Sequence, residues 1–106
     1  MPLTPQQATE LLNSLGQNDL ATVYFTKHAL ERVEERGITI LDARHVIAYG
    51  TVLTPPQTST RKHDNLYKYK IEGRSPNSGA REIGVVAVPS EADMSLKIVS
   101  VMWIDL

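Results

Sequence analysis

Three residues in the stretch FTKHALERVEERGI have side chains suited to shared chemistry: His28, Arg32 and Arg36. They recur every fourth position, so in a helix they stay on one side and form a ridge, here called the cationic ridge. Histidine suits proton transfer near neutral pH because its reference pKa is about 6.5. Arginine suits phosphate because its planar guanidinium donates two parallel hydrogen bonds and stays protonated. The spacing therefore places a general acid or base beside two phosphate-binding cations.

A structural interpretation of the cationic ridge stays open beside the catalytic one. Glu35 can pair with Arg32 or Arg36 across the helix surface, and such exposed ion pairs contribute about 0–1 kcal/mol each. In that case the helix carries a salt-bridged surface, and His28 is an ordinary residue at its edge. The spacing alone does not decide between the two interpretations.

The surrounding pattern predicts three helices, followed by strands. The expected start and stop residues of the helices are Thr4 and Gly16, Thr26 and Gly37, and Thr39 and Gly50. Residues 18–24 are expected to form a turn or a short extended segment. The buried sides of the second and third helices are expected to carry Ala29, Leu30, Val33, Leu41, Val46 and Ile47.

After Gly50 the sequence has the features of β-strands, beginning with a short strand over residues 51–54 that the following prolines end. Residues 65–73 alternate, with Tyr67, Tyr69 and Ile71 on one face and Lys68, Lys70 and Glu72 on the other. Residues 81–88 and 96–104 are apolar on both faces, as is typical of central strands, and the loop between them suits an antiparallel hairpin. The predicted fold class is α+β: two or three N-terminal helices packed on one face of an approximately four-stranded antiparallel sheet.

The composition limits the classes of function. The 106 residues suit one domain, and the absence of cysteine excludes disulfides and thiolate metal sites. His28, His45 and His63 follow no ligand spacing, so we expect neither a metal site nor another cofactor. No stretch approaches the roughly 20 apolar residues of a membrane span. The first residues also lack the pattern of a signal peptide, so we expect no membrane association and a cytoplasmic location.

The charge is unevenly distributed along the chain. The formal net charge of −1 argues against a strongly basic nucleic-acid binder. Residues 61–82, however, contain six basic and three acidic side chains, an excess that can form a basic patch or simply a solvated strand and loop. The six basic residues are Arg61, Lys62, Lys68, Lys70, Arg74 and Arg81.

The motifs together resemble an uncharacterised bacterial family, domain of unknown function 4258. The matching features are His28-Ala29, Arg32, Arg36-Gly37-Ile38, the segment from Tyr69 to Gly73 and a late VSVMW. The resemblance covers roughly residues 24–104. We therefore expect an N-terminal helical extension over residues 1–23 and a domain over residues 24–106.

That family is similar to the RelE-like toxins, whose compact α+β domains are often metal-independent ribonucleases neutralised by a protein antitoxin. The resemblance implies a RelE-like fold and RNA cleavage, in which a base activates the ribose 2′-hydroxyl and cations stabilise the phosphorane. His28 would be the acid or base, and Arg32 and Arg36 would stabilise phosphate, with Lys68 or Tyr69 assisting from the sheet. The expected partners are a cognate antitoxin and an RNA held by Arg61, Lys62, Lys70, Arg74 and Arg81.

A second class of function stays open. Such toxins are usually basic, whereas this chain has a net charge of −1, and three glutamates lie around the cationic ridge. The alternative is a non-enzymatic protein-binding or regulatory module on the same fold, with the ridge helix as an interaction surface. A nucleic-acid binder without catalysis is a third possibility.

Overall fold

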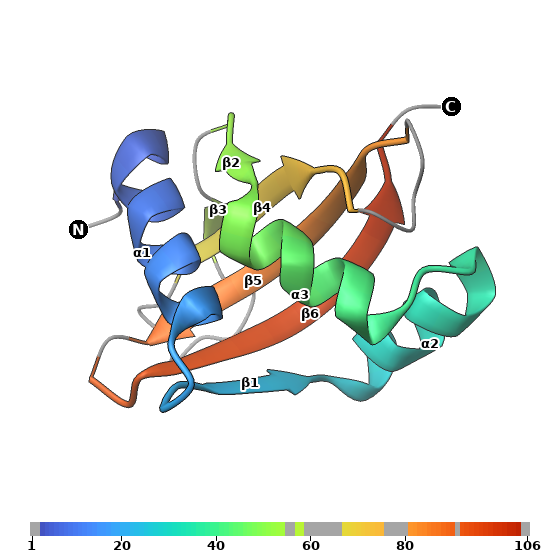
Figure 1. The fold of residues 1–106 in the computed structure, drawn as a ribbon, viewed down its shortest axis with the longest axis horizontal. Helices are drawn as coiled ribbons and strands as arrows, with labels where there is room; N and C mark the ends of the chain where they lie inside the picture. The colour runs from blue at the N-terminus through green and yellow to red at the C-terminus, as the bar shows by residue number, and fades with distance from the viewer. Residues whose placement is uncertain (1–2, 55–56, 59–66, 76–80, 91, 105–106) are drawn as a thin grey trace.

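The computed structural model describes residues 3–54, 57–58, 67–75, 81–90 and 92–104. Within these residues the chain forms three helices and six strands (Figure 1). The helices are α1 (Pro5–Gln17), α2 (Lys27–Arg36) and α3 (Ile40–Tyr49). The strands are β1 (Thr22–Phe25), β2 (Thr51–Val52), β3 (Gln57–Thr58), β4 (Tyr67–Gly73), β5 (Ile83–Ser90) and β6 (Ser95–Trp103). The predicted α+β class is confirmed.

Threonine side chains fix the start of every described helix, as the sequence predicted. The hydroxyls of Thr4, Thr26 and Thr39 each accept a hydrogen bond from a backbone N–H in the first turn. Helix α2 ends at Gly37, which has a left-handed backbone (φ 67°) that a side chain rarely tolerates. These boundaries depend on near neighbours in the chain, so local sequence rules can identify them.

The predicted end of the first helix is wrong, because α1 continues through Gly16 to Gln17. A Cβ atom at Gly16 would lie 2.9 Å from Ile47 Cγ2 and 3.0 Å from the Ala48 backbone nitrogen. Gly16 therefore allows α1 and α3 to pack closely and does not terminate the helix. That requirement involves residues of another helix, so the local sequence pattern does not reveal it.

The sheet has the strand order β1-β6-β5-β4-β2, and β3 pairs with β4 off this path. Strands β4, β5 and β6 are antiparallel, but β1 runs parallel to β6, with Phe25 opposite Ile98. The sheet is therefore mixed, with five strands in its main path, and not the approximately four-stranded antiparallel sheet that was predicted. Strand β1 has only four residues, too short to show a periodic pattern, whereas β2 lies within the strand predicted over residues 51–54.

Helices α1 and α3 cross one face of the sheet, and α2 lies near β6 (Figure 1). Leu12 of α1, Ile47 of α3 and Ile98 of β6 are almost fully buried in the same core. Four of the six side chains expected to be buried are buried, but Leu30 and Leu41 are 45% and 73% exposed. Each helix also carries an apolar side chain next to its buried side, so the sequence pattern did not identify which positions face the sheet.

Side chains of α1 also complete the end of α3. The Asn13 amide donates to the backbone oxygens of Ile47 at 2.8 Å and Gly50 at 3.4 Å, and the Gln17 amide donates to that of Ala48 at 2.7 Å. The last carbonyl groups of a helix have no intrahelical partner, so these bonds satisfy groups that would otherwise need water. Helix α1 is thus joined to the rest of the fold by both apolar and polar contacts.

Candidate functional site

The cationic ridge lies at the edge of the sheet beside β6. Strand β1 leads directly into α2, and at this junction the backbone N–H of Thr26 donates to the Ile98 oxygen at 3.0 Å. Ala29 and Val33 then bury the inner side of α2, which packs against β6. The pairing of β1 with β6 stops at Ile98, so α2 continues along the part of β6 that β1 does not reach.

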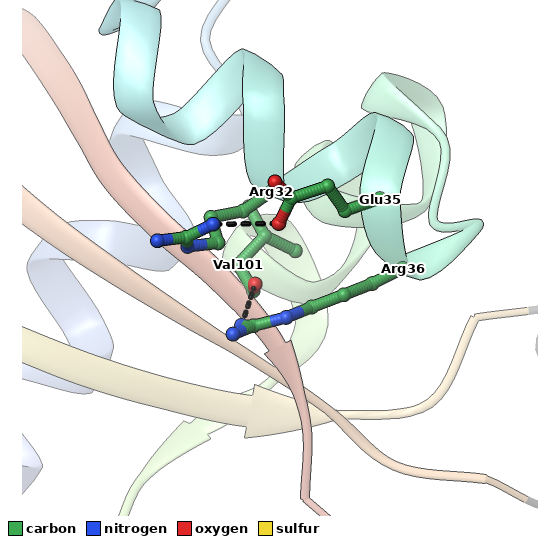
Figure 2. A network of polar contacts seen from close by, with 4 residues as sticks. All are labelled: Arg32, Glu35, Arg36 and Val101. Atoms are coloured by element: carbon green, nitrogen blue, oxygen red, sulfur yellow. Dashed lines mark hydrogen bonds and ion pairs between the residues drawn. The ribbon is translucent and has the colours of Figure 1, made fainter.

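Arg36 joins the end of α2 to β6. Its Nη1 donates to the backbone oxygen of Val101 at 2.7 Å (Figure 2), and the Trp103 Nε1 donates to the backbone oxygen of Arg36 at 2.7 Å. The Arg81 guanidinium lies over the Trp103 ring, 3.9 Å from its centroid. Arg36 therefore makes a structural contact with β6. The sequence did not predict that Trp103 lies beside the cationic ridge.

Arg32 forms the surface ion pair that the structural interpretation anticipated. Its Nη1 lies 2.6 Å from Glu35 Oε2, and the two side chains are 30% and 58% exposed. In Figure 2 the side chains of Arg32 and Arg36 extend from α2 to the same side, toward β6. An exposed pair of this kind contributes about 0–1 kcal/mol, so an incoming anion can displace Glu35 at little cost.

His28 is exposed in the first turn of α2, four residues before Arg32. Among the residues that the structure describes, none forms a hydrogen bond or an ion pair with its imidazole. Its two ring nitrogens are therefore open to solvent or to a ligand. The structure brings His28 and Arg32 together on one helix side, while Arg36 is held by β6.

The two candidates from the sheet point to opposite faces. Tyr69 is 3% exposed, and its hydroxyl accepts a hydrogen bond from the backbone N–H of Leu3 at 2.8 Å. Lys68 precedes it on β4, so it points to the other face, as the alternation predicted. Strand β5 separates β4 from β6, which places the Tyr69 backbone about 10 Å from β6. The structure therefore does not bring Tyr69 to the cationic ridge.

The residues expected to bind RNA are dispersed. Lys70 is half-buried on the same sheet face as Lys68, whereas Arg74 lies past the end of β4 and pairs with Glu82 at 4.0 Å. Arg81 lies over Trp103, as described above. Two further residues of this set, Arg61 and Lys62, lie outside the described residues, as does His63.

Other polar groups in the core have structural partners. Asp42, 5% exposed, accepts hydrogen bonds from the backbone N–H of Thr39 at 3.1 Å and from the Ser75 hydroxyl. It therefore joins the start of α3 to the segment after β4. Within the described part of the chain, no three His, Cys, Asp or Glu side chains gather as a possible set of metal ligands. No helix described here is long and apolar enough to cross a membrane.

The contact between Arg36 and Val101 leads to a prediction about stability. Arg36→Met keeps the apolar stem but leaves the Val101 oxygen without its charged donor, so we expect the free energy of unfolding to fall by about 1–3 kcal/mol. Arg32→Met removes only an exposed ion pair, and should cost about 0–1 kcal/mol. Urea denaturation followed by the fluorescence of Trp103, the one tryptophan in the sequence, measures both. Equal losses in the two variants would contradict a structural role for Arg36.

The comparisons with known proteins identify one family. The family model described as Domain of unknown function (DUF4258) matches residues 25–103. The match begins at the last residue of β1 and includes α2 with the cationic ridge, α3 and the other strands. Comparisons with curated proteins and with solved structures each found no match. The match extends over well more than half of the 106 residues. The chain therefore belongs to the domain of unknown function 4258 family.

Proposed function

We propose that the chain is a toxin-like, metal-independent endoribonuclease of a bacterial toxin–antitoxin system, related to the RelE-like toxins. The observation that carries this proposal is the pairing of an exposed histidine with an accessible arginine on one side of α2. Side chains four residues apart on a helix have Cβ atoms about 5–6 Å apart. His28 and Arg32 are therefore close enough to contact the same ribose–phosphate unit.

In the proposed reaction, His28 acts as the general base. Its neutral imidazole takes the proton of a ribose 2′-hydroxyl, and the 2′-oxygen attacks the adjacent phosphorus. The bond from phosphorus to the 5′-oxygen breaks, and that oxygen takes a proton from water, whose hydroxide then takes the proton held by His28. The products are a 2′,3′-cyclic phosphate and a 5′-hydroxyl. Arg32 stabilises the extra negative charge of the phosphorane, because a guanidinium matches the geometry of phosphate oxygens.

The other expected site residues have different roles in this proposal. Arg36 is a positioning residue, because its guanidinium binds the Val101 oxygen and holds α2 against β6. Lys68 and Lys70 attract the RNA from the sheet, where charged side chains raise the local concentration of a polyanion. Tyr69 is not included, because its hydroxyl is buried and accepts a hydrogen bond from Leu3.

Induced expression in a bacterial host tests this proposal. The wild type is expected to arrest growth and to fragment total RNA, and the double variant His28→Asn, Arg32→Gln is expected to do neither. Both side chains are at least partly exposed and outside the core, so the double variant should accumulate as folded protein. Normal growth with intact RNA, at high soluble expression of the wild type, would overturn the ribonuclease proposal.

One observation favours a second function, a non-enzymatic module that binds another protein. Leu41 and Tyr49 of α3 are 73% and 68% exposed, and His45 between them lies with its ring 4.9 Å from that of Tyr49. Positions four residues apart share one side of a helix, so these three form a largely apolar stripe at the surface. Exposed apolar stripes are typical of protein-binding surfaces. A negative result in the expression experiment would favour this function.

A further inference from the structure

We propose that single-stranded RNA binds across the outer face of the sheet, with one base stacked on Tyr24 and a phosphate held by Lys97. The outer face is the side of the sheet opposite the buried side chains of Tyr69 and Ile71. This inference rests on the proposed function and specifies the form of its substrate. Neither Tyr24 nor Lys97 was among the residues that the sequence motifs selected.

The register of β1 and β6 places Tyr24 and Lys97 side by side. The two residues are opposite one another in the parallel ladder, so their side chains share a face. Leu96 and Ile98, which flank Lys97, are fully buried in the core, and therefore Lys97 points away from the core. Tyr24 is 48% exposed, so its ring is available for stacking at the open edge of the sheet.

Further lysines lie on the same face. Lys70 on β4 is opposite Val86 on β5, and Lys97 on β6 is opposite Val88. Val86 and Val88 are two residues apart on one strand, so all four side chains project to one side. Lys68 belongs to this side as well. The described strand residues on the outer face thus include three lysines, Lys68, Lys70 and Lys97, and one acidic residue, Glu72.

The positive face leads to the cationic ridge. Lys97 and Val101 pair with Val88 and Val85 of β5, which are three residues apart because β6 has a bulge between them, and this corresponds to about 10 Å along the strand. Helix α2 begins beside Ile98 and its last residue, Arg36, binds the oxygen of Val101, so the ridge runs along this part of β6. An RNA strand with a base on Tyr24 can therefore follow β6 toward His28 and Arg32.

The geometry selects single-stranded RNA over a duplex. A base stacks on an aromatic side chain only when its own face is free, as in single strands and loops. Aromatic stacking combined with a row of lysines is the usual chemistry of sequence-tolerant single-strand binding. Cleavage through a 2′-hydroxyl also needs a flexible backbone, which a paired helix restricts.

Binding is measured by fluorescence anisotropy with a labelled single-stranded RNA, using His28→Asn protein so that no cleavage occurs. Tyr24→Leu should weaken binding about 5- to 100-fold, and Tyr24→Phe, which keeps the ring, should bind as the parent does. Tyr49→Leu is the matched control, because Tyr49 is an exposed tyrosine on α3, and it should change nothing. Lys97→Gln should make the dependence of log K on log salt less steep by about 0.7.

Equal affinity of Tyr24→Leu and the parent would overturn the inference, as would a duplex bound as tightly as the single strand. A crosslinking measurement on the His28→Asn protein, in which Tyr24 is intact, covers the case in which Tyr24→Leu does not fold. Single-stranded RNA that carries 4-thiouridine should crosslink to the peptide that contains Tyr24 or the one that contains Lys97. Crosslinks confined to α3 would overturn the inference.

The two proposals can fail separately. If Tyr24→Leu abolishes binding but the wild type cleaves no RNA, the outer face binds RNA and the ribonuclease proposal is wrong. If the wild type cleaves RNA and Tyr24→Leu cleaves and binds it equally well, the ribonuclease proposal stands and the stacking site is wrong. If the wild type neither binds nor cleaves RNA, both proposals are overturned.

Discussion

Replacement of His28 by alanine is expected to slow RNA cleavage by about 10²- to 10⁴-fold, the usual contribution of a general acid or base. The fold should be unaffected, because His28 is exposed and the described residues include no hydrogen-bond partner for it. Single-turnover rates with a short fluorogenic RNA measure the effect. Thermal unfolding of the same samples shows whether the variant stays folded.

The matched control for His28→Ala is Lys27→Ala, which removes a cation from the adjacent exposed position of α2. If the loss in His28→Ala comes from proton transfer, Lys27→Ala should retain the wild-type rate within about threefold, because the loss of a single positive charge weakens RNA binding only modestly. Similar losses in both variants would indicate electrostatic attraction alone. A wild-type rate in His28→Ala would remove His28 from the mechanism.

Leu12→Ala is expected to lower the free energy of unfolding by about 2–5 kcal/mol, because it leaves a cavity in a fully buried site. That loss is large beside the 5–15 kcal/mol that typically separates folded from unfolded domains. The matched control is Leu20→Ala, in which the same atoms are removed from a side chain that is 85% exposed. It should change stability by no more than about 0.5 kcal/mol.

The probe for the Leu12→Ala measurement lies far from the mutation in sequence, because Trp103 is on β6 and Leu12 is on α1. In a cooperative domain, urea unfolding seen at Trp103 should shift by the full amount. An unchanged transition at Trp103 would show that α1 is a separate extension that can unfold by itself. The experiment therefore decides whether residues 1–23, which lie outside the family match, form part of one folding unit.

Local rules were sufficient wherever the stabilising contact is local. Thr26 and Gly37 bound α2 through bonds that reach no more than a few residues along the chain. The alternation on β4 was also predicted correctly, because the side chains of one strand point alternately to two faces that differ in burial. These features identified the helix that carries the cationic ridge and the lysines of the sheet.

The sequence predicted less of the candidate site than of the helices and strands. The spacing of His28, Arg32 and Arg36 predicted a ridge, but it treated the two arginines as equivalent. They differ because Arg36 binds the oxygen of Val101, 65 residues later, while Arg32 pairs with Glu35 on its own helix. Tyr24 was overlooked because a four-residue strand has too little pattern to show which of its side chains face solvent.

The sequence by itself thus determined the helix boundaries set by threonine and glycine, the helical ridge and the two faces of β4. Tertiary structure alone decided the parallel pairing of β1, the close approach at Gly16 and the separate roles of Arg32 and Arg36. The physical reason is the range of the interaction. Capping and alternation act within a few residues, whereas strand partners and packing contacts join segments that only the folded chain brings together.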